Sequence, residues 1–387
     1  MFEQFLTISA MNIRNIVSRW SSSSVVVVGI AGVVAVLVAM LSMASGISNV
    51  FSKSTATDRA VVVRSGSDSE LSSNLSGEVG RIVAAMDGVA IAAPELYAVA
   101  DVPKKATGTP ANTVVRGVET LSFDIRPKLK IIEGRMFESG RNEIIVGVKT
   151  RAEFEGMDIG NQLIVRESTW EVVGIFEADG SIAESEIWAD LTVTQSAFRR
   201  QQSITVVRVQ FDSPTDFDNV AALIEDDPRL ETDFVREEDW FSSQSDSSTV
   251  VIRVFGVVVA IIMSIGAIFA ALNTMYSAVA ARTFEIATLR AIGFGGAPVL
   301  VSVMLEAMFL ALVGGIIGAA ISFLTFNGFT VSTLNQQTFS QVAFDFAVTP
   351  ELMVAGLVLS LALGFIGGIF PGFRAVFLPV TTALRGE

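Results

Sequence analysis

The chain has 387 residues, 51% of them hydrophobic, a formal net charge of −13 and no cysteine or histidine. Without histidine, Ser-His-Asp and Cys-His catalysis and every histidine-based metal site are excluded. Without cysteine, an exported domain would form no disulfide and would rest on its own hydrophobic core. The acidic balance gives no support to nucleic-acid binding.

The N-terminal segment, residues 1–20, carries apolar side chains at helical spacing. This spacing predicts an amphipathic lead-in helix that lies in the inner interface of a membrane. The alternative is that these residues simply extend the helix of the apolar, membrane-crossing segment that follows, which we call the first span. The first span, residues 21–47, has an apolar core over residues 25–43. That core is longer than the apolar region of a signal peptide and no A-x-A cleavage site follows, so we expect it to be retained.

A large acidic insert follows, the head, which we place at residues 48–249. Between residues 46 and 248 there are 34 acidic and 20 basic side chains. Two similar blocks lie at its ends, and periodicity predicts their elements. The first has a strand at 59–64, a helix at 75–86 and strands at 90–102 and 113–118; the second has a strand at 204–211, a helix at 216–224 and a strand at 231–235. We expect the blocks to form one split β-α-β layer of an α+β domain.

Residues 120–200 interrupt this layer. Short apolar runs at 143–148, 162–166, 171–176 and 186–189 are separated by glycine-containing turns, which predicts an inserted all-β lobe. A serine-rich segment, 242–249, is a candidate stalk or hinge before the second span at 250–276.

Two further spans complete the chain, at residues 298–323 and 352–371. All four apolar cores, at 25–43, 254–275, 299–323 and 352–370, have roughly the 20 residues that a membrane-crossing helix needs. The expected fold is an α-helical membrane protein with four transmembrane helices in a 1 + 3 arrangement around the head. Glycines in the last two spans favour close helix contact; they are Gly314, Gly315, Gly318, Gly364, Gly367 and Gly368.

Arginines predict the orientation. They lie near the first span, in the loop 277–297 and in the tail 372–387, as Arg14, Arg19, Arg282, Arg290, Arg374 and Arg385. The loop 324–351 has no lysine or arginine between residues 325 and 351. We therefore expect both termini and the loop 277–297 in the cytoplasm, and the head and the loop 324–351 outside.

ATP chemistry has no support in this sequence. The pattern G-x-x-x-x-G-K-[ST] is absent, and the nearest fragment, residues 147–150, lacks the glycine before Lys149. A Ser-x-x-Lys nucleophile is absent as well. We expect no enzyme activity in this chain, and no catalytic, cofactor-binding or metal-binding residues.

The loop between the second and third spans reads A-R-T-F-E-I-A-T-L-R-A-I-G over residues 281–293. Glu306 follows within the third span, and the chain closes with a proline motif at 371–375 and P-V-T-T-A-L-R at 379–385. The chain resembles the FtsX-like permease domain of MacB-type ABC transporters, of the type VII ABC superfamily. In that family the pattern is R-x-x-E-I-x-x-L-R-A-[IL]-G, then an intramembrane Glu, then P-x-x-x-A…P-x-x-A-L-R.

The head resembles the MacB periplasmic domain at V-R-G (115–117), E-G-R (133–135), Gly156 to Ile164 and V-V-G-I-F (172–176). Three departures are visible. MacB itself carries its ATPase on the same chain, whereas this chain begins directly with the lead-in segment, so we expect the ATPase to be a separate subunit. Gly372 replaces the alanine usual after the proline, and three residues rather than two separate Pro379 from Ala383.

The resemblance implies a stand-alone permease subunit whose loop 277–297 is a coupling helix for a separate ABC ATPase subunit, which would bind the ATP. Six residues of the loop are the candidates for this role: Arg282, Phe284, Glu285, Leu289, Arg290 and Gly293. For the two arginines, orientation alone is the alternative. Glu306 is an intramembrane carboxylate, which is costly to bury. We favour a structural pairing with Arg282 or Arg290 over a proton or substrate role.

The family resemblance also implies a bacterial inner-membrane location and a dimer of identical or different permease chains. Movement of the head, by mechanotransmission, would drive export from the periplasm or the outer leaflet, with a periplasmic adaptor and an outer-membrane channel. Extraction of lipoproteins and FtsX-like regulation of cell-wall hydrolases are the alternatives.

Overall fold

The computed structural model describes residues 20–293, 295–335 and 337–377. The predicted lead-in helix, apart from its last residue, and the closing motif at 379–385 lie outside the described residues. The described chain forms two compact units. Among the described residues, we call 46–250 with 330–345 the head, and 20–45, 251–329 and 346–377 the membrane unit.

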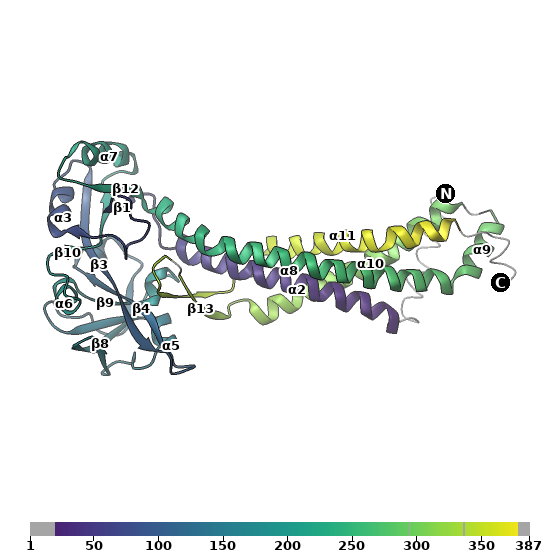
Figure 1. Cartoon of the computed structure of the whole chain (residues 1–387), viewed down its shortest axis with the longest axis horizontal. Coiled ribbons are helices and arrows are strands. Elements are labelled where there is room, and N and C mark those ends of the chain that lie inside the picture. Colours follow the sequence, from purple (N-terminus) through teal and green to yellow (C-terminus); the bar gives the residue numbers. More distant parts are fainter. Residues whose placement is uncertain (1–19, 294, 336, 378–387) are drawn as a thin grey trace. The chain divides into compact units, whose positions relative to one another are not determined.

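Four long apolar helices are found in the part of the chain that is described: α2 (Trp20–Ser52), α8 (Glu237–Ala281), α10 (Gly296–Phe326) and α11 (Pro350–Val376) (Figure 1). Each is long and apolar enough to cross a membrane, which confirms the four predicted spans as helices. Helices α2 and α8 extend beyond the spans, and their ends belong to the head. The serine-rich segment at 242–249, a candidate hinge, is helical and lies within α8.

Small residues let the membrane helices approach one another closely. A Cβ atom at Gly314 would lie 2.8 Å from the Val27 carbonyl oxygen, and one at Gly364 would lie 3.1 Å from the Ala307 carbonyl oxygen. Ser322 also donates a hydrogen bond from α10 to the Ala35 carbonyl of α2, at 2.9 Å. Because lipid supplies no hydrophobic force between helices, such tight contacts hold α10 against α2 and α11.

The head is built on one ten-stranded mixed sheet with the order β12-β1-β11-β3-β4-β9-β6-β8-β5, and β7 pairs with β8. The strands are β1 (Arg59–Arg64), β3 (Val89–Pro103), β4 (Pro110–Val118), β5 (Lys130–Gly134), β6 (Glu143–Gly147), β7 (Gln162–Val165), β8 (Ser168–Glu177), β9 (Glu186–Asp190), β11 (Val206–Phe211) and β12 (Thr232–Arg236). Strands from both ends of the head thus alternate in its first part. Two short strands, β2 (Leu75–Ser76) and β10 (Ser203–Ile204), pair separately.

Two helices pack on one face of this first part. They are α3 (Gly77–Ala84) and α7 (Phe217–Asp226), which follows the 3-10 turn η3 (Pro214–Asp216). Val83 of α3 and Val220 of α7 are buried in one cluster with Val207 and Val209 of β11. Side chains alternate along a strand, so Arg208 between these valines points to the opposite face.

The expectation that residues 120–200 are all-β is wrong. The segment contains α4 (Leu121–Asp124), α5 (Val148–Glu153), the 3-10 turn η2 (Ile182–Ser185) and α6 (Leu191–Ala197) besides its strands. Asp190 is the N-cap of α6, a helix-start signal that is visible in the sequence. The Asp190 carboxylate accepts hydrogen bonds from the Thr192 and Val193 amides, which caps the helix.

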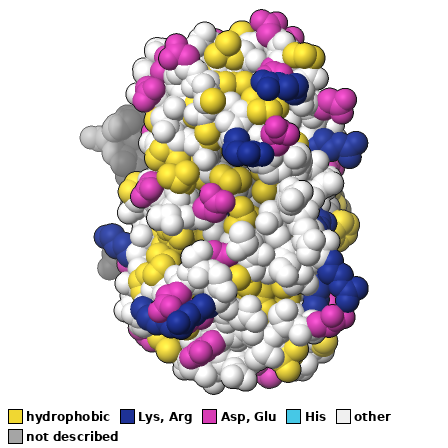
Figure 2. Space-filling view, turned by 90° about the vertical axis from the view of Figure 1, so that its left-hand side faces the viewer, with side chains coloured by type: hydrophobic (Ala, Val, Ile, Leu, Met, Phe, Trp, Pro, Cys, Tyr) yellow, Lys and Arg dark blue, Asp and Glu magenta, His cyan; other side chains and the backbone are white. Residues whose placement is uncertain are grey.

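The loop between α10 and α11 contributes a hairpin to the head. Its strands are β13 (Thr330–Leu334) and β14 (Gln341–Asp345), which pair antiparallel. Ser340 bonds the Tyr97 hydroxyl at 3.0 Å, and Lys104 donates to Ser332 at 3.1 Å. The sequence did not lead us to expect this hairpin. Figure 2 shows a face on which acidic, basic and hydrophobic side chains are interspersed.

Candidate functional site

The loop between α8 and α10 folds into a separate short helix. Helix α8 ends at Ala281, Arg282 adopts φ −108° and ψ 12°, and α9 runs Thr283–Ala291. Gly293 follows with a φ of +104°, a left-handed conformation that favours glycine and ends the helix. The predicted coupling segment is therefore a helix set off from both neighbours.

One side of α9 is held within the membrane unit by a buried ion pair. The two terminal nitrogens of Arg282 donate to the two carboxylate oxygens of Glu306, at 2.9 and 3.1 Å. Arg282 is 6% exposed and Glu306 is 5% exposed. This bidentate arrangement satisfies both ions where water is scarce. The structural pairing that we favoured for Glu306 is confirmed, and Arg282 is the partner.

The other residues predicted for coupling divide between an inner and an outer side of α9. Arg290 donates from Nη1 to the Val376 carbonyl of α11 at 2.5 Å, which ties α9 to the last span. Leu289 is half-buried and lines a cavity of about 30 Å³ together with Arg282 and Glu306. Phe284 and Glu285 are exposed, as is Gly293.

The outer side of α9 is apolar as well as exposed. Phe284 is 63% exposed and Ile292 is 72% exposed. Glu285 lies beside Phe284, whereas Ile286 and Ala287 are buried on the inner side. A large apolar side chain next to a carboxylate on a helix that is anchored from behind is suited to a groove in a partner protein.

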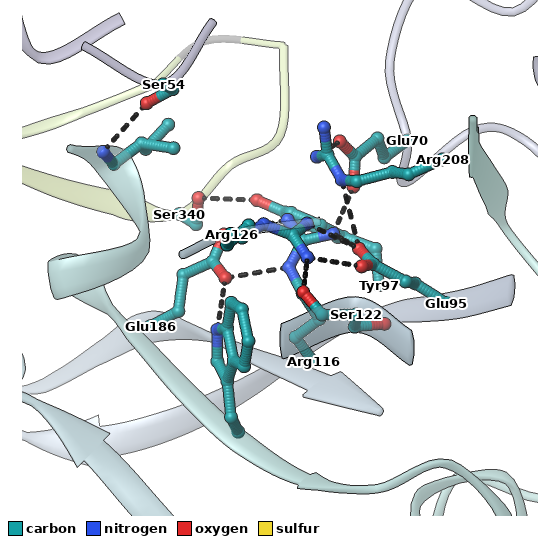
Figure 3. Close-up of polar contacts among 12 residues, drawn as sticks. Ser54, Glu70, Glu95, Tyr97, Arg116, Ser122, Arg126, Glu186, Arg208 and Ser340 are labelled. Atoms are coloured by element: carbon teal, nitrogen blue, oxygen red, sulfur yellow. Dashed lines mark hydrogen bonds and ion pairs between the residues drawn. The ribbon is translucent and has the colours of Figure 1, made fainter. Parts of the chain in front are cut away.

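The head contains a second concentration of charge that sequence analysis missed. Three arginines and four glutamates form one network of ion pairs, which Figure 3 draws in part. Its members are Glu70, Glu95, Arg116, Arg126, Glu186, Arg208 and Glu237. We call it the arginine network.

Sheet register explains why these side chains meet. Arg116 of β4 is opposite Tyr97 of β3 and Trp188 of β9. Residues opposite one another point to the same face, and so do residues two apart on one strand. Glu95 and Glu186 therefore share the face of Arg116. Arg208 joins them because its partner across the strands, Ala93, is two residues from Glu95.

Glu95 is the centre of the arginine network. Its carboxylate accepts hydrogen bonds from Arg116 at 2.9 Å, from Arg208 at 3.1 Å, and from Arg126 at 2.7 and 3.0 Å. Burial by itself raises the pKa of Glu95, but the charges of Arg126, Arg208 and Arg116 outweigh it and hold the pKa well below its ordinary value. Glu95 is therefore a carboxylate that depends on three cations.

Comparison with known proteins identifies the family of this chain. Residues 23–227 match the model of the MacB-like periplasmic core domain, and residues 257–380 match that of the FtsX-like permease C-terminal region. The chain belongs to the MacB-like family of FtsX-type permeases. The resemblance seen in the sequence is confirmed, and the protein is of the permease class of ABC transporters.

Individual relatives of this MacB-like permease are distant. A macrolide export ATP-binding/permease protein MacB of Rhodopseudomonas palustris (strain BisB18) is 23% identical over 72% of this chain and 44% of its own length. The chain thus spans less than half of that relative. A lipoprotein-releasing system transmembrane protein LolC of Xylella fastidiosa (strain Temecula1) is 26% identical over 71% of this chain and 72% of its own length.

Among solved structures, the periplasmic region of MacB from Actinobacillus actinomycetemcomitans is similar, with 13% identity and a TM-score of 0.38. The similarity covers 48% of this chain and 91% of the solved MacB chain.

Part of the arginine network could have been found in the sequence of this MacB-like permease. Arg116 and Arg208 each stand inside a strand of valines, in T-V-V-R-G-V and V-V-R-V-Q-F. A charge on a buried strand needs a partner, so these two positions signal buried acids. Nothing local identifies the partners, because Glu70 and Glu237 are far away in the chain.

Proposed function

We propose that this chain is the permease of an ABC transporter that turns ATP hydrolysis by a separate subunit into movement of the head. The observation that carries the proposal is helix α9. It presents Phe284, Glu285 and Ile292 outward while Arg282 and Arg290 fasten it to α10 and α11. A helix held in this way can transmit a displacement, imposed by a bound partner protein, to α10 and α11.

Helix α8 supports this mechanism. It runs without interruption from Glu237 to Ala281, and α9 begins two residues later. Its first residue, Glu237, is bound to Arg208 in the arginine network at 2.7 Å. Because one helix carries residues of both units, displacement of α9 would be transmitted along α8 to the sheet of the head.

A route for a polar substrate through this single chain has little support. In the described parts of the four membrane helices, Glu306 is a buried carboxylate, and both of its oxygens are occupied by Arg282. Intramembrane charges that serve as a pathway face water or substrate. We therefore propose that the substrate is taken up from the periplasm or the outer leaflet by a dimer that acts with an adaptor and an outer-membrane channel.

Lipoprotein release is the second candidate function. It is favoured by one observation: the LolC relative is matched over 72% of its own length, against 44% for the MacB relative. In this case the arrangement of α8 and α9 would serve the same transmission, and the cargo would be a lipid-anchored protein.

The test removes the outer side of α9. Phe284→Ala with Glu285→Ala should weaken co-purification of the ATPase subunit about tenfold or more, because interface anchors of this kind each contribute over 1 kcal/mol. Phe329→Ala with Glu351→Ala is the matched control, since it changes an exposed phenylalanine that follows α10 and an exposed glutamate in the first turn of α11. Equal binding and equal coupled ATPase activity in both double variants would show that α9 is not the docking element.

Orientation is tested with single cysteines, since the chain has none. Ala106 of the head and Ser277 of α8 are both exposed, so a cysteine at either position is accessible within the described chain. In intact spheroplasts, Ala106→Cys should react with an impermeant maleimide and Ser277→Cys should not. Labelling of Ser277→Cys alone would reverse the proposed topology.

A further inference from the structure

A cavity of about 120 Å³ lies within the head beside the arginine network. Figure 3 draws several of its lining residues, among them Arg116, Arg126 and Arg208. Its lining combines residues that follow α2 with residues of the sheet. Six cationic side chains take part: Lys53, Arg59, Arg116, Arg126, Lys128 and Arg208. A water molecule needs roughly 10–15 Å³ of such space, so the cavity is large enough for a small polyatomic group.

The cationic side chains of the lining differ in how many of their N–H groups already make hydrogen bonds. Arg116 and Arg208 direct all three guanidinium nitrogens to glutamate oxygens of the network. Arg59 does not. Its Nε is buried and makes no hydrogen bond with any described residue, and its nearest carboxylates, Glu237 and Asp58, are 3.7 and 3.9 Å away. A buried donor without a partner is costly, and it needs an acceptor.

Lys53 is the second cation of the lining to consider, and its side chain is exposed. It lies one residue after the end of α2 and makes no ion pair within 4.0 Å in the described part of the chain, although Asp179 lies close enough to feel its charge. Lys128 binds Asp179 at 3.0 Å. The Nε of Arg59, buried without a hydrogen bond, and the exposed ammonium of Lys53 thus both line this cavity.

Glu186 is an acidic residue of the cavity lining, but it repels a bound anion only weakly. Glu186 accepts two hydrogen bonds from Arg116 at 2.7 Å and one from the Trp188 indole at 2.7 Å. The negative charge of Glu186 is therefore largely compensated by Arg116 and by the N–H of Trp188. The remaining carboxylates of the network do not line the cavity.

We propose that this cavity binds a phosphate-type oxyanion, held by Arg59 and Lys53. A phosphate group has several strong acceptor oxygens, and arginine binds it with charge-assisted hydrogen bonds. The group can be free phosphate or the phosphodiester of a lipid, because both present the same phosphate oxygens to these cations. The proposal does not depend on what the permease transports.

The experiment uses the full chain, purified in a phosphate-free detergent buffer. Isothermal titration calorimetry is carried out with inorganic phosphate in one arm and with dihexanoyl phosphatidylglycerol below its micelle concentration in the other. Binding in the first arm alone identifies a soluble ligand, and binding in the second arm alone identifies a lipid headgroup. Absence of binding in both arms overturns the proposal.

Variants assign the binding to the cavity. Lys53→Gln and Arg59→Gln should each weaken binding about tenfold, the effect of one charge-assisted hydrogen bond. Arg64→Gln is the matched control, because Arg64 lies on the same strand as Arg59 but is exposed and does not line the cavity. Lys53→Gln leaves the arginine network intact, so its result stands even if Arg59→Gln fails to fold. Equal affinity of Lys53→Gln and the Arg64→Gln control contradicts the proposed site.

Discussion

The head and the membrane unit both bury charge, and they satisfy it in different ways. In the head, Glu95 accepts hydrogen bonds from three arginines, and each of Arg116 and Arg208 binds more than one glutamate. In the membrane unit, Glu306 and Arg282 bind one another in a closed pair. A sheet places side chains from several strands on one face, whereas two helices that cross bring together few positions.

The difference has a consequence for substitution. A closed pair can be replaced as a pair, because no third group loses its partner. The network cannot, since removal of Glu95 leaves three arginines short of an acceptor and removal of Glu70 leaves two. The two units differ in packing too. Trp170 and Trp188 are fully buried in the head, whereas the membrane unit relies on glycines at its helix contacts.

The largest effect is expected for Glu95→Ala. The substitution leaves Arg116, Arg126 and Arg208 without their shared acceptor, and should destabilise the head by about 3–5 kcal/mol. Denaturant unfolding of the full chain, followed by tryptophan fluorescence, measures the change. Asp101→Ala is the control, as Asp101 is an exposed acid of the same strand. A loss no greater than that of the control would mean that the network contributes little to stability.

A smaller effect is expected for Glu306→Gln, about 3 kcal/mol in the membrane unit, because Arg282 keeps one neutral acceptor but loses its counter-charge. The double variant Arg282→Met with Glu306→Leu should recover most of this loss, since it removes both ions. Unfolding in mixed micelles provides the measurement. If the double variant is as unstable as the single one, the pair has further partners and resembles the network.

Glycine packing is expected to contribute about 1–3 kcal/mol at a single contact. Gly318→Ala places a Cβ against the Ala31 carbonyl and the Val34 side chain. A Cβ added at Gly266 has no neighbouring atom of the described chain within 4 Å. The first should lower the melting temperature of the membrane unit and the second should not. Similar behaviour of the two variants would argue against close contact of α2 with α10.

The smallest effect is expected on the stability of the head at low pH. The hydrogen bonds from Arg135 lower the pKa of Glu143 from its ordinary value of 4.5 to about 2, against the opposing effect of burial. A lowered pKa stabilises the fold above pH 4.5, and this contribution is lost as the pH falls towards 2. Glu143→Gln should therefore flatten the fall in stability of the head over this range, measured by unfolding at each pH. An unchanged pH profile would contradict the pairing with Arg135.

Much of the architecture follows from local sequence. The four spans are long apolar runs, and a run of that length has few alternatives to a membrane-crossing helix. Strands β1, β3 and β6 were predicted to within two residues or fewer because each is a largely apolar run bounded by charged or turn residues. The coupling segment around Phe284 was found by its motif, and the structure then showed which of its residues are exposed.

Tertiary structure decided the rest. The partner of Glu306 could have been Arg282 or Arg290, and only helix packing distinguishes them. The hairpin β13–β14 joins the head although it lies between two membrane helices in the chain. The arginine network depends on the register of β3, β4, β9 and β11. Hydrophobic periodicity is a property of neighbours in the chain, whereas ion partners and register depend on residues that only folding brings together.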